Sequence, residues 1–330
     1  MDFIGKEIED IKGRLKNMVD CAAIIGCNRQ LIQIKLVKTP HRQLLCQFQF
    51  PENYPDNPII IELKSNLFEV KVLCLLSERC DVEAKKLVGR AQVISMTKFI
   101  SKFLDDNPLM VCSEEVSYIK KSLVDSQDDL KIKQKSGVLR YKICQDRYFL
   151  DVKVTVPEFY PTDCVRVENK SCNFPTFLET HFMAESIEIA RRCVEPPLKK
   201  DPKAPPFQPA PSLKQVVSYL VKDCIKKFPG GICKLCGKRA LPKNPEDYPE
   251  NPDDEKGVVW IYCNHIYHLG CMDAYMKTPP FTGGKKCIEC GKVVYHDRWN
   301  ISPKLAEERW AHQEARKREI DEVADFLDLM

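Results

Sequence analysis

Eight residues of the types that bind zinc lie within 58 residues near the C-terminus of this 330-residue chain. They are Cys233, Cys236, Cys263, His265, His268, Cys271, Cys287 and Cys290. Their spacing is C-x2-C, 26 residues, C-x-H-x2-H-x2-C, 15 residues, and C-x2-C. Thiolate and imidazole are preferred ligands of zinc, and four of them complete one structural tetrahedral site. Eight ligands therefore predict two Zn²⁺ ions, with no ligand left over for an open catalytic position.

The composition argues for a soluble protein of a reducing compartment. Lys and Arg number 51 against 47 Asp and Glu, and a net charge of +4 makes no case for nucleic-acid binding. No stretch approaches the roughly 18 apolar residues that a membrane helix needs, and the start at Met1-Asp2-Phe3-Ile4 is unlike a signal peptide. The 11 cysteines outside the cluster show no pairing pattern. We expect a cytoplasmic or nuclear protein without membrane or nucleic-acid partners.

An internal repeat precedes the cluster. Residues 48–55 read FQFPENYP and residues 154–161 read VTVPEFYP, with their tyrosines 106 residues apart. Each copy is an alternating apolar run, then Pro-Glu-x-Tyr-Pro, then another β-rich run. The strands predicted on this pattern are 30–37, 43–50 and 59–64 in the first copy, and 138–144, 148–156 and 164–168 in the second. The predicted helices are 5–18 and 95–104, then 114–124 and 213–228.

The last of these helices has the clearest start signal. Ser212 is a good N-cap, and Gln215 three residues on completes the pattern of a capping box. Residues 196–211 before it hold seven prolines and no periodicity, so we expect an extended surface segment there.

The ligand order Cys, Cys, Cys, His, His, Cys, Cys, Cys resembles a RING finger of the H2 type. In that family the ligand pairs alternate between the two metals. The resemblance therefore implies one zinc held by Cys233, Cys236, His268 and Cys271. It implies a second held by Cys263, His265, Cys287 and Cys290.

The repeated segments resemble the RWD and ubiquitin-conjugating-enzyme fold. Tyr54-Pro55-Asp56-Asn57-Pro58 is similar to that superfamily's Tyr-Pro-x-x-Pro signature, whereas Tyr160-Pro161 keeps only its first half. The His-Pro-Asn triplet of active conjugating enzymes occurs nowhere in the sequence. We therefore interpret Cys74, Cys80 and Cys172 as structural thiols, and the two tyrosines as braces of their loops.

The predicted fold class is α+β, with four segments in chain order. Two RWD-like antiparallel sheet-and-helix domains are expected at 1–110 and 111–228, and a two-zinc RING-H2 module at 229–300. A charged helix is expected at 301–330, where Ser302 is an N-cap and Pro303 stands at the first helical position. Its apolar stripe of Ile320, Val323, Phe326 and Leu327 would pack on another part of the chain or dock into a partner's groove.

The architecture resembles RING-type E3 ubiquitin ligases, which bind a ubiquitin-charged conjugating enzyme (E2) and promote transfer to a substrate lysine without a covalent intermediate. The resemblance implies no catalytic nucleophile, and RWD-like domains that recruit substrate or complex subunits. The alternative is a non-catalytic, zinc-stabilised RWD adaptor or scaffold in a multi-protein complex.

The resemblance also implies which residues contact the E2. In the family, the residue before the second ligand and an aromatic residue four positions after the sixth are anchors, here Leu235 and Tyr275. Pro279 and Pro280 would complete the groove rim, and Lys292 would substitute for an Arg or Lys that contacts both ubiquitin and the E2. Two positions depart from active members: Ile288 stands where many have proline, and Gly291 where many have Arg or Lys.

Overall fold

The computed structural model describes residues 2–197 and 205–328. Its contacts divide the chain into two compact units. The first unit comprises residues 1–144, 149–172 and 176–224, and the second comprises 145–148, 173–175 and 225–330. Both four-stranded sheets belong to the first unit, apart from Gln145 and Tyr148 at two strand ends. The structure confirms a mixed α+β class with antiparallel sheets and a C-terminal helix.

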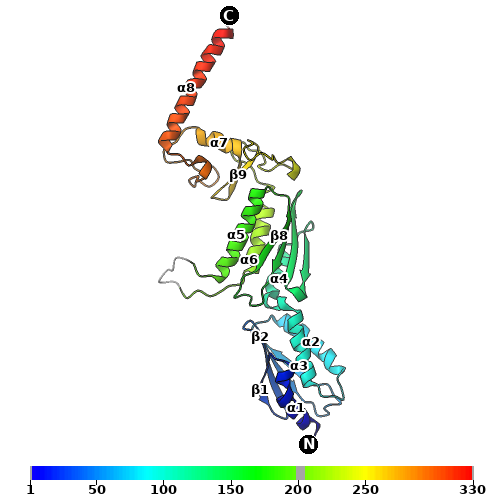
Figure 1. The fold of residues 1–330 in the computed structure, drawn as a ribbon. Coiled ribbons are helices and arrows are strands. Elements are labelled where there is room, and N and C mark those ends of the chain that lie inside the picture. The colour runs from blue at the N-terminus through cyan, green and yellow to red at the C-terminus, as the bar shows by residue number, and fades with distance from the viewer. Residues whose placement is uncertain (1, 198–204, 329–330) are drawn as a thin grey trace. The chain divides into compact units, whose positions relative to one another are not determined.

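The first sheet is a meander in chain order (Figure 1). Its elements are α1 (Phe3–Met18), β1 (Ala22–Cys27), β2 (Leu31–Thr39), β3 (Arg42–Gln49), β4 (Ile60–Lys64), α2 (Val70–Lys85) and α3 (Val93–Asp106). Neighbouring strands pair antiparallel, with Ile34 opposite Cys46. Every second side chain of β2 and β3 is buried, because successive residues of a strand face opposite sides. The buried face meets Ile11 and Leu15 of α1 in one core.

The second sheet repeats this order. Its elements are α4 (Ser113–Ser122), β5 (Asp129–Lys133), β6 (Val138–Gln145), β7 (Tyr148–Thr155), β8 (Arg166–Cys172), α5 (Thr176–Val194) and α6 (Leu213–Ser218). The chain continues from α6 as a π-helical turn over Tyr219–Ile225. Helices α5 and α6 pack on each other, and α5 also contacts β8 (Figure 1).

A buried carboxylate and the loop tyrosine tie the first copy together. The hydroxyl of Tyr54 donates to Oε2 of Glu7 at 2.5 Å and accepts from the backbone N–H of Gln92 at 3.0 Å. The other carboxylate oxygen accepts from the N–H groups of Gln92 and Val93, both at 2.9 Å. Glu7 on α1 thus satisfies N–H groups at the start of α3, where a helix favours negative charge.

The second copy contains the same arrangement. The hydroxyl of Tyr160 donates to Oε2 of Glu115 at 2.5 Å and accepts from the N–H of Leu213 at 3.1 Å. Oε1 of Glu115 accepts from the N–H of Lys214 at 2.9 Å. Both Tyr-Pro peptide bonds are cis. The tyrosines therefore brace their loops against the first and last helices, as expected from the sequence.

The predicted capping box at Ser212 is wrong. Its hydroxyl accepts from the N–H of Val165 at 3.1 Å and makes no cap to its own helix. The first-turn N–H groups of α6 are already bonded to Tyr160 and Glu115. Of the proline-rich segment, residues 205–211 form neither helix nor strand, and residues 198–204 lie outside the described residues.

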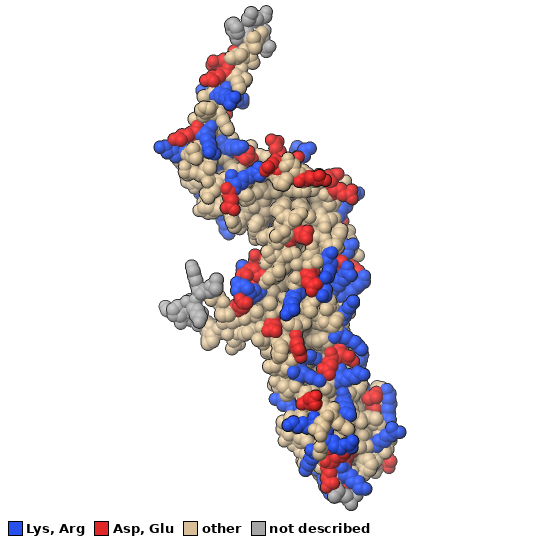
Figure 2. All heavy atoms as spheres, in the orientation of Figure 1, with Lys and Arg blue, Asp and Glu red and all other residues tan. Residues whose placement is uncertain are grey.

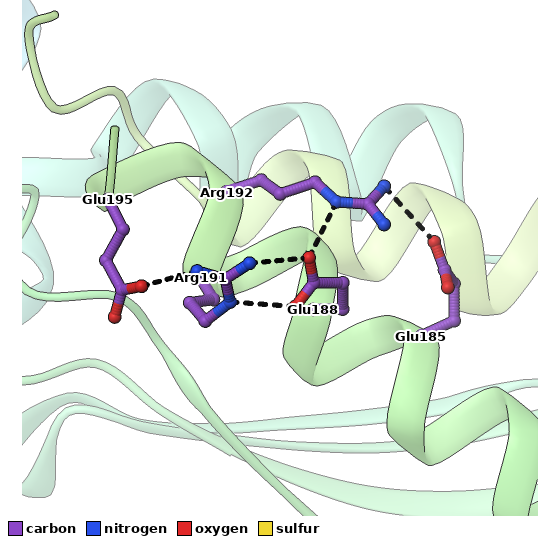
Figure 3. A network of polar contacts seen from close by, with 5 residues as sticks. All are labelled: Glu185, Glu188, Arg191, Arg192 and Glu195. Atoms are coloured by element: carbon purple, nitrogen blue, oxygen red, sulfur yellow. Dashed lines mark hydrogen bonds and ion pairs between the residues drawn. The ribbon is translucent and has the colours of Figure 1, made fainter. Parts of the chain in front are cut away.

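Helix α5 carries a network of ion pairs on its exposed face (Figure 3). Glu188 accepts a bidentate pair of 2.8 Å hydrogen bonds from Arg191 and one of 2.9 Å from Arg192. Glu195 and Glu185 extend the network at its two ends. The bonds from the two arginines lower the pKa of Glu188 to about 2. Exposed ion pairs of this kind contribute little to stability. Figure 2 shows that positive and negative side chains are interspersed over this face of the molecule.

The second unit has less regular structure. It contains the hairpin of β9 (Val258–Ile261) and β10 (His265–His268), then α7 (Leu269–Lys277) and α8 (Pro303–Asp328). The N–H of Leu305 donates to the Ser302 hydroxyl at 3.3 Å, which confirms the predicted N-cap. Ile320, Val323 and Leu327 are 58%, 60% and 63% exposed, so α8 does not bury its stripe, and the side chain of Phe326 lies outside the described residues. None of the described helices combines the length and apolar character needed to cross a membrane.

Candidate metal centre

The structure brings the eight Cys and His residues into two groups of four, interleaved in sequence. One group is Cys233, Cys236, His268 and Cys271, and the other is Cys263, His265, Cys287 and Cys290. Within each group the ligand atoms lie within 4.8 Å of one another. A zinc tetrahedron with bonds of about 2.3 Å spaces its ligand atoms about 3.8 Å apart. Each group could therefore hold a metal ion with little rearrangement.

Two matching turns supply half of the ligands. Cys233-Lys-Leu-Cys236-Gly237-Lys238 and Cys287-Ile-Glu-Cys290-Gly291-Lys292 share the pattern C-x2-C-G-K. In each turn the first cysteine's N–H donates to the lysine carbonyl, at 2.8 Å and 2.7 Å, and the glycine N–H donates back to the first cysteine's carbonyl at 2.8 Å. Gly237 and Gly291 have φ of +73° and +71°, a region that L residues other than Asn and Asp rarely adopt. Backbone geometry thus accounts for the glycine at position 291.

Both histidines turn Nδ1 towards sulfur. Nδ1 of His268 lies 3.3 Å from Sγ of Cys236, and Nδ1 of His265 lies 3.2 Å from Sγ of Cys263. The other ring nitrogens face acceptors: Nε2 of His268 lies 3.0 Å from the Arg239 carbonyl, and Nε2 of His265 lies 3.6 Å from the Glu289 carboxylate. Metal-bound histidines are typically oriented by such an acceptor on the second nitrogen. Nδ1 is therefore the metal-facing atom at both positions.

Thiol ionisation is uneven within each group when no metal is bound. Burial, and then the neighbouring thiols of Cys287 and Cys290, raise the pKa of Cys263 to about 12. Burial also opposes ionisation of Cys287, but hydrogen bonds from the Tyr267 hydroxyl and backbone N–H groups lower its pKa to about 6. The Cys287 thiolate thus forms readily and opposes ionisation of Cys263. A divalent cation would relieve this repulsion, because it stabilises every thiolate that it binds.

In the first group, too, the pKa of one thiol is lowered and that of another is raised. Hydrogen bonding from the Lys238 backbone is the main cause that lowers the pKa of Cys236. Burial, then the neighbouring Cys236 and Cys233, raise the pKa of Cys271 to about 12. The chemistry of both donor sets, thiols with one imidazole each, suits zinc.

His296 lies outside both groups, and its Nδ1 accepts a hydrogen bond from the backbone N–H of Arg298.

The residues predicted to meet an E2 lie on the two turns, on α7 and just after α7. Leu235 and Tyr275 are half-buried, and the Tyr275 hydroxyl donates to the Lys286 carbonyl at 2.9 Å. The side chains of Pro279, Pro280 and Lys292 are exposed. Ile288, in the second turn, is 52% exposed, so a large apolar side chain faces solvent beside the second group.

Cys80 does not have the properties of an acceptor thiol. It is fully buried, and burial raises its pKa to about 12. A thioester-forming cysteine needs an accessible thiolate of lowered pKa. Cys74 is exposed and Cys172 is half-buried. The interpretation of Cys80 as a structural thiol agrees with its burial.

Replacing Gly291 by alanine should weaken the second turn through backbone strain. An added Cβ meets no atom within 4 Å, so the cost is conformational, about 1–2 kcal/mol. Gly291→Asn should cost less, because asparagine tolerates positive φ better. Chelator competition on the metal-loaded chain measures the effect, with Gly237→Ala as the matched change in the first turn. Equal metal retention by Gly291→Ala and the unaltered chain would contradict the strain argument.

No protein-family model matches the chain, and no curated protein matches it.

Proposed function

We propose that this protein is a zinc-dependent RING-type E3 ubiquitin ligase. The observation that carries the proposal is the alternation of the ligand groups: the first and third ligand pairs converge, as do the second and fourth. This cross-brace joins two C-x2-C-G-K turns to the β9–β10 hairpin and the start of α7. Two Zn²⁺ ions would supply structural support and take no part in the transfer reaction.

The chemistry needs no nucleophile on this chain. An E3 of this type holds the E2 and its thioester-linked ubiquitin in an orientation that favours attack by a lysine, and orientation alone can accelerate such a step greatly. Leu235 and Tyr275 would contact the E2 with Pro279 and Pro280 at the rim, and exposed Ile288 would add apolar surface. Lys292 would contact ubiquitin and the E2 in place of the Arg or Lys that many active family members carry at the position of Gly291. The two sheet-and-helix repeats, as RWD-like domains, would recruit the substrate or partner subunits.

The direct test is discharge of ubiquitin-loaded E2 enzymes to free lysine. The unaltered chain should accelerate discharge from at least one E2 of a broad panel. Leu235→Ala should slow this reaction at least about fivefold, because truncating a central apolar anchor is costly at an interface. Cys74→Ser, a change at an exposed thiol far along the chain from the zinc ligands, should leave the rate unchanged.

The opposite outcome would favour the adaptor or scaffold function. If no E2 in the panel is discharged faster while two metals per chain are present, the ligase proposal fails. Loss of discharge in Cys74→Ser with folding intact would instead indicate a thioester step on this chain.

A further inference from the structure

A buried lysine lies beside the second zinc-binding turn. Lys285 is 7% exposed, and its Nζ has no hydrogen-bond partner among the described residues. Nζ lies 4.5 Å from the ring centroid of Tyr275 and 5.6 Å from that of Phe281. An ammonium group near aromatic faces is attracted to them, most strongly where water is excluded. The two rings are therefore the groups that stabilise this buried charge, and the charge in turn holds the rings.

The contacts continue from Phe281 to α8. The rings of Phe281 and Trp310 are tilted at 57° with centroids 6.4 Å apart. Nearby, the indole N–H of Trp299 donates to Asp273 on α7 at 3.0 Å. A cavity of about 440 Å³ lies between α7 and the start of α8, and its lining includes Lys285, Phe281 and both tryptophans. The first turns of α8 thus meet the zinc module through the contact between Phe281 and Trp310, beside an open cavity.

This chain of contacts ends on Tyr275. Its ring faces the ammonium of Lys285, and its hydroxyl is bonded to the Lys286 carbonyl at 2.9 Å. The ring is therefore restrained at its face and at its tip. A contact residue that is already immobilised loses less side-chain freedom when a partner binds.

We propose that Lys285 is a positioning residue that fixes the Tyr275 ring for E2 binding, and that Trp310 supports it through Phe281. The inference rests on the proposed function, and it gives the start of α8 a role in E2 binding. Losing the restraint should weaken E2 affinity about 2- to 10-fold, because binding would then have to immobilise one additional side chain. The rate at saturating E2 should stay unchanged, because no contact specific to the transfer step is lost.

Three variants of the full-length, metal-loaded chain test the proposal. Lys285→Met keeps the length and apolar stem but removes the charge, and should weaken E2 affinity 2- to 10-fold. Lys285→Arg keeps the charge and should stay within about twofold of the unaltered chain. Trp310→Ala should weaken binding in the same direction as Lys285→Met. Lys317→Ala, at an exposed position of α8 outside its apolar stripe, is the matched control and should change nothing.

A second readout separates this inference from the proposed function. Aromatic NMR signals of Tyr275, recorded without E2, should shift in Lys285→Met and Trp310→Ala but not in Lys317→Ala, with two metals retained in each. Unaltered E2 affinity in both Lys285→Met and Trp310→Ala overturns the inference. If the unaltered chain binds no E2, the proposed function fails, and unchanged Tyr275 signals would then remove the positioning role as well.

Discussion

Removing the two metal ions is expected to unfold residues 229–300 while both four-stranded sheets remain folded. This segment has one two-stranded hairpin and one nine-residue helix, α7, to organise a small core. Apparent zinc-binding free energies of structural sites are about 10–16 kcal/mol, comparable to the whole stability of an ordinary domain. Without metal, burial and the neighbouring thiols also oppose ionisation of Cys263 in one group and of Cys271 in the other. The metals therefore decide whether this segment folds.

Chelator titration with residue-resolved amide spectra measures this effect. Amide signals from β9, β10 and α7 should collapse as metal is withdrawn, whereas those of β2, β3, β6 and β7 should persist. Elemental analysis of the untreated protein should give two zinc ions per chain. Cys287→Ser should lose metal from the second group, and Cys74→Ser, at an exposed thiol outside both groups, should keep both ions. Fewer than two zincs per chain, or a folded segment after complete chelation, would contradict the prediction.

Elements with strong apolar alternation were predictable from the sequence, and others were not. β2, β3, β6 and β7 carry buried residues at every second position and lie within about two residues of the expected ranges. β5 was missed because it has no buried residue and reads as a polar loop. The 19-residue α5 was also missed: Ser186 and Ala190 stand in its buried stripe, where periodicity needs large apolar residues. α2 shows the same weakness, with Cys80 and Ala84 on its buried side.

The two groups that could hold a metal ion were predictable because thiol and imidazole at fixed spacing have few other uses. The groups that form hydrogen bonds to these residues were not predictable, since they come from residues that become neighbours only in the folded chain. The Arg239 carbonyl behind His268 and the Tyr267 hydroxyl 3.1 Å from Cys287 are examples. The role of Gly291 could have been predicted from the sequence, because Gly291 and Gly237 stand at the same position of the repeated C-x2-C-G-K pattern. The rings around Lys285 come from α7 and from the loop that follows it, a convergence that no local pattern indicates.

Replacing Glu7 by alanine is expected to destabilise the first sheet and its helices by about 3–5 kcal/mol, because hydrogen bonds to a charged group contribute about 1.5–3 kcal/mol each. The carboxylate is 4% exposed and accepts from the Tyr54 hydroxyl and from the N–H groups of Gln92 and Val93. Alanine would leave these donors short of an acceptor in a buried setting, which costs more than the bonds themselves contribute. Glu7→Gln should cost less, because one oxygen remains to accept the two amide N–H groups.

Hydrogen exchange of the full chain, read over α1 and α3, isolates this loss from the stability of the other parts. Glu9→Ala, an exposed glutamate on the same helix, is the matched control and should change stability by less than about 0.5 kcal/mol. Glu115→Ala should weaken the second copy by less than Glu7→Ala weakens the first, since Glu115 is half-buried and accepts one helix N–H instead of two. Equal losses for Glu7→Ala and Glu9→Ala would show that the Tyr54 brace does not stabilise the fold. Equal losses for Glu7→Ala and Glu115→Ala would show that burial of the carboxylate does not set the difference between the copies.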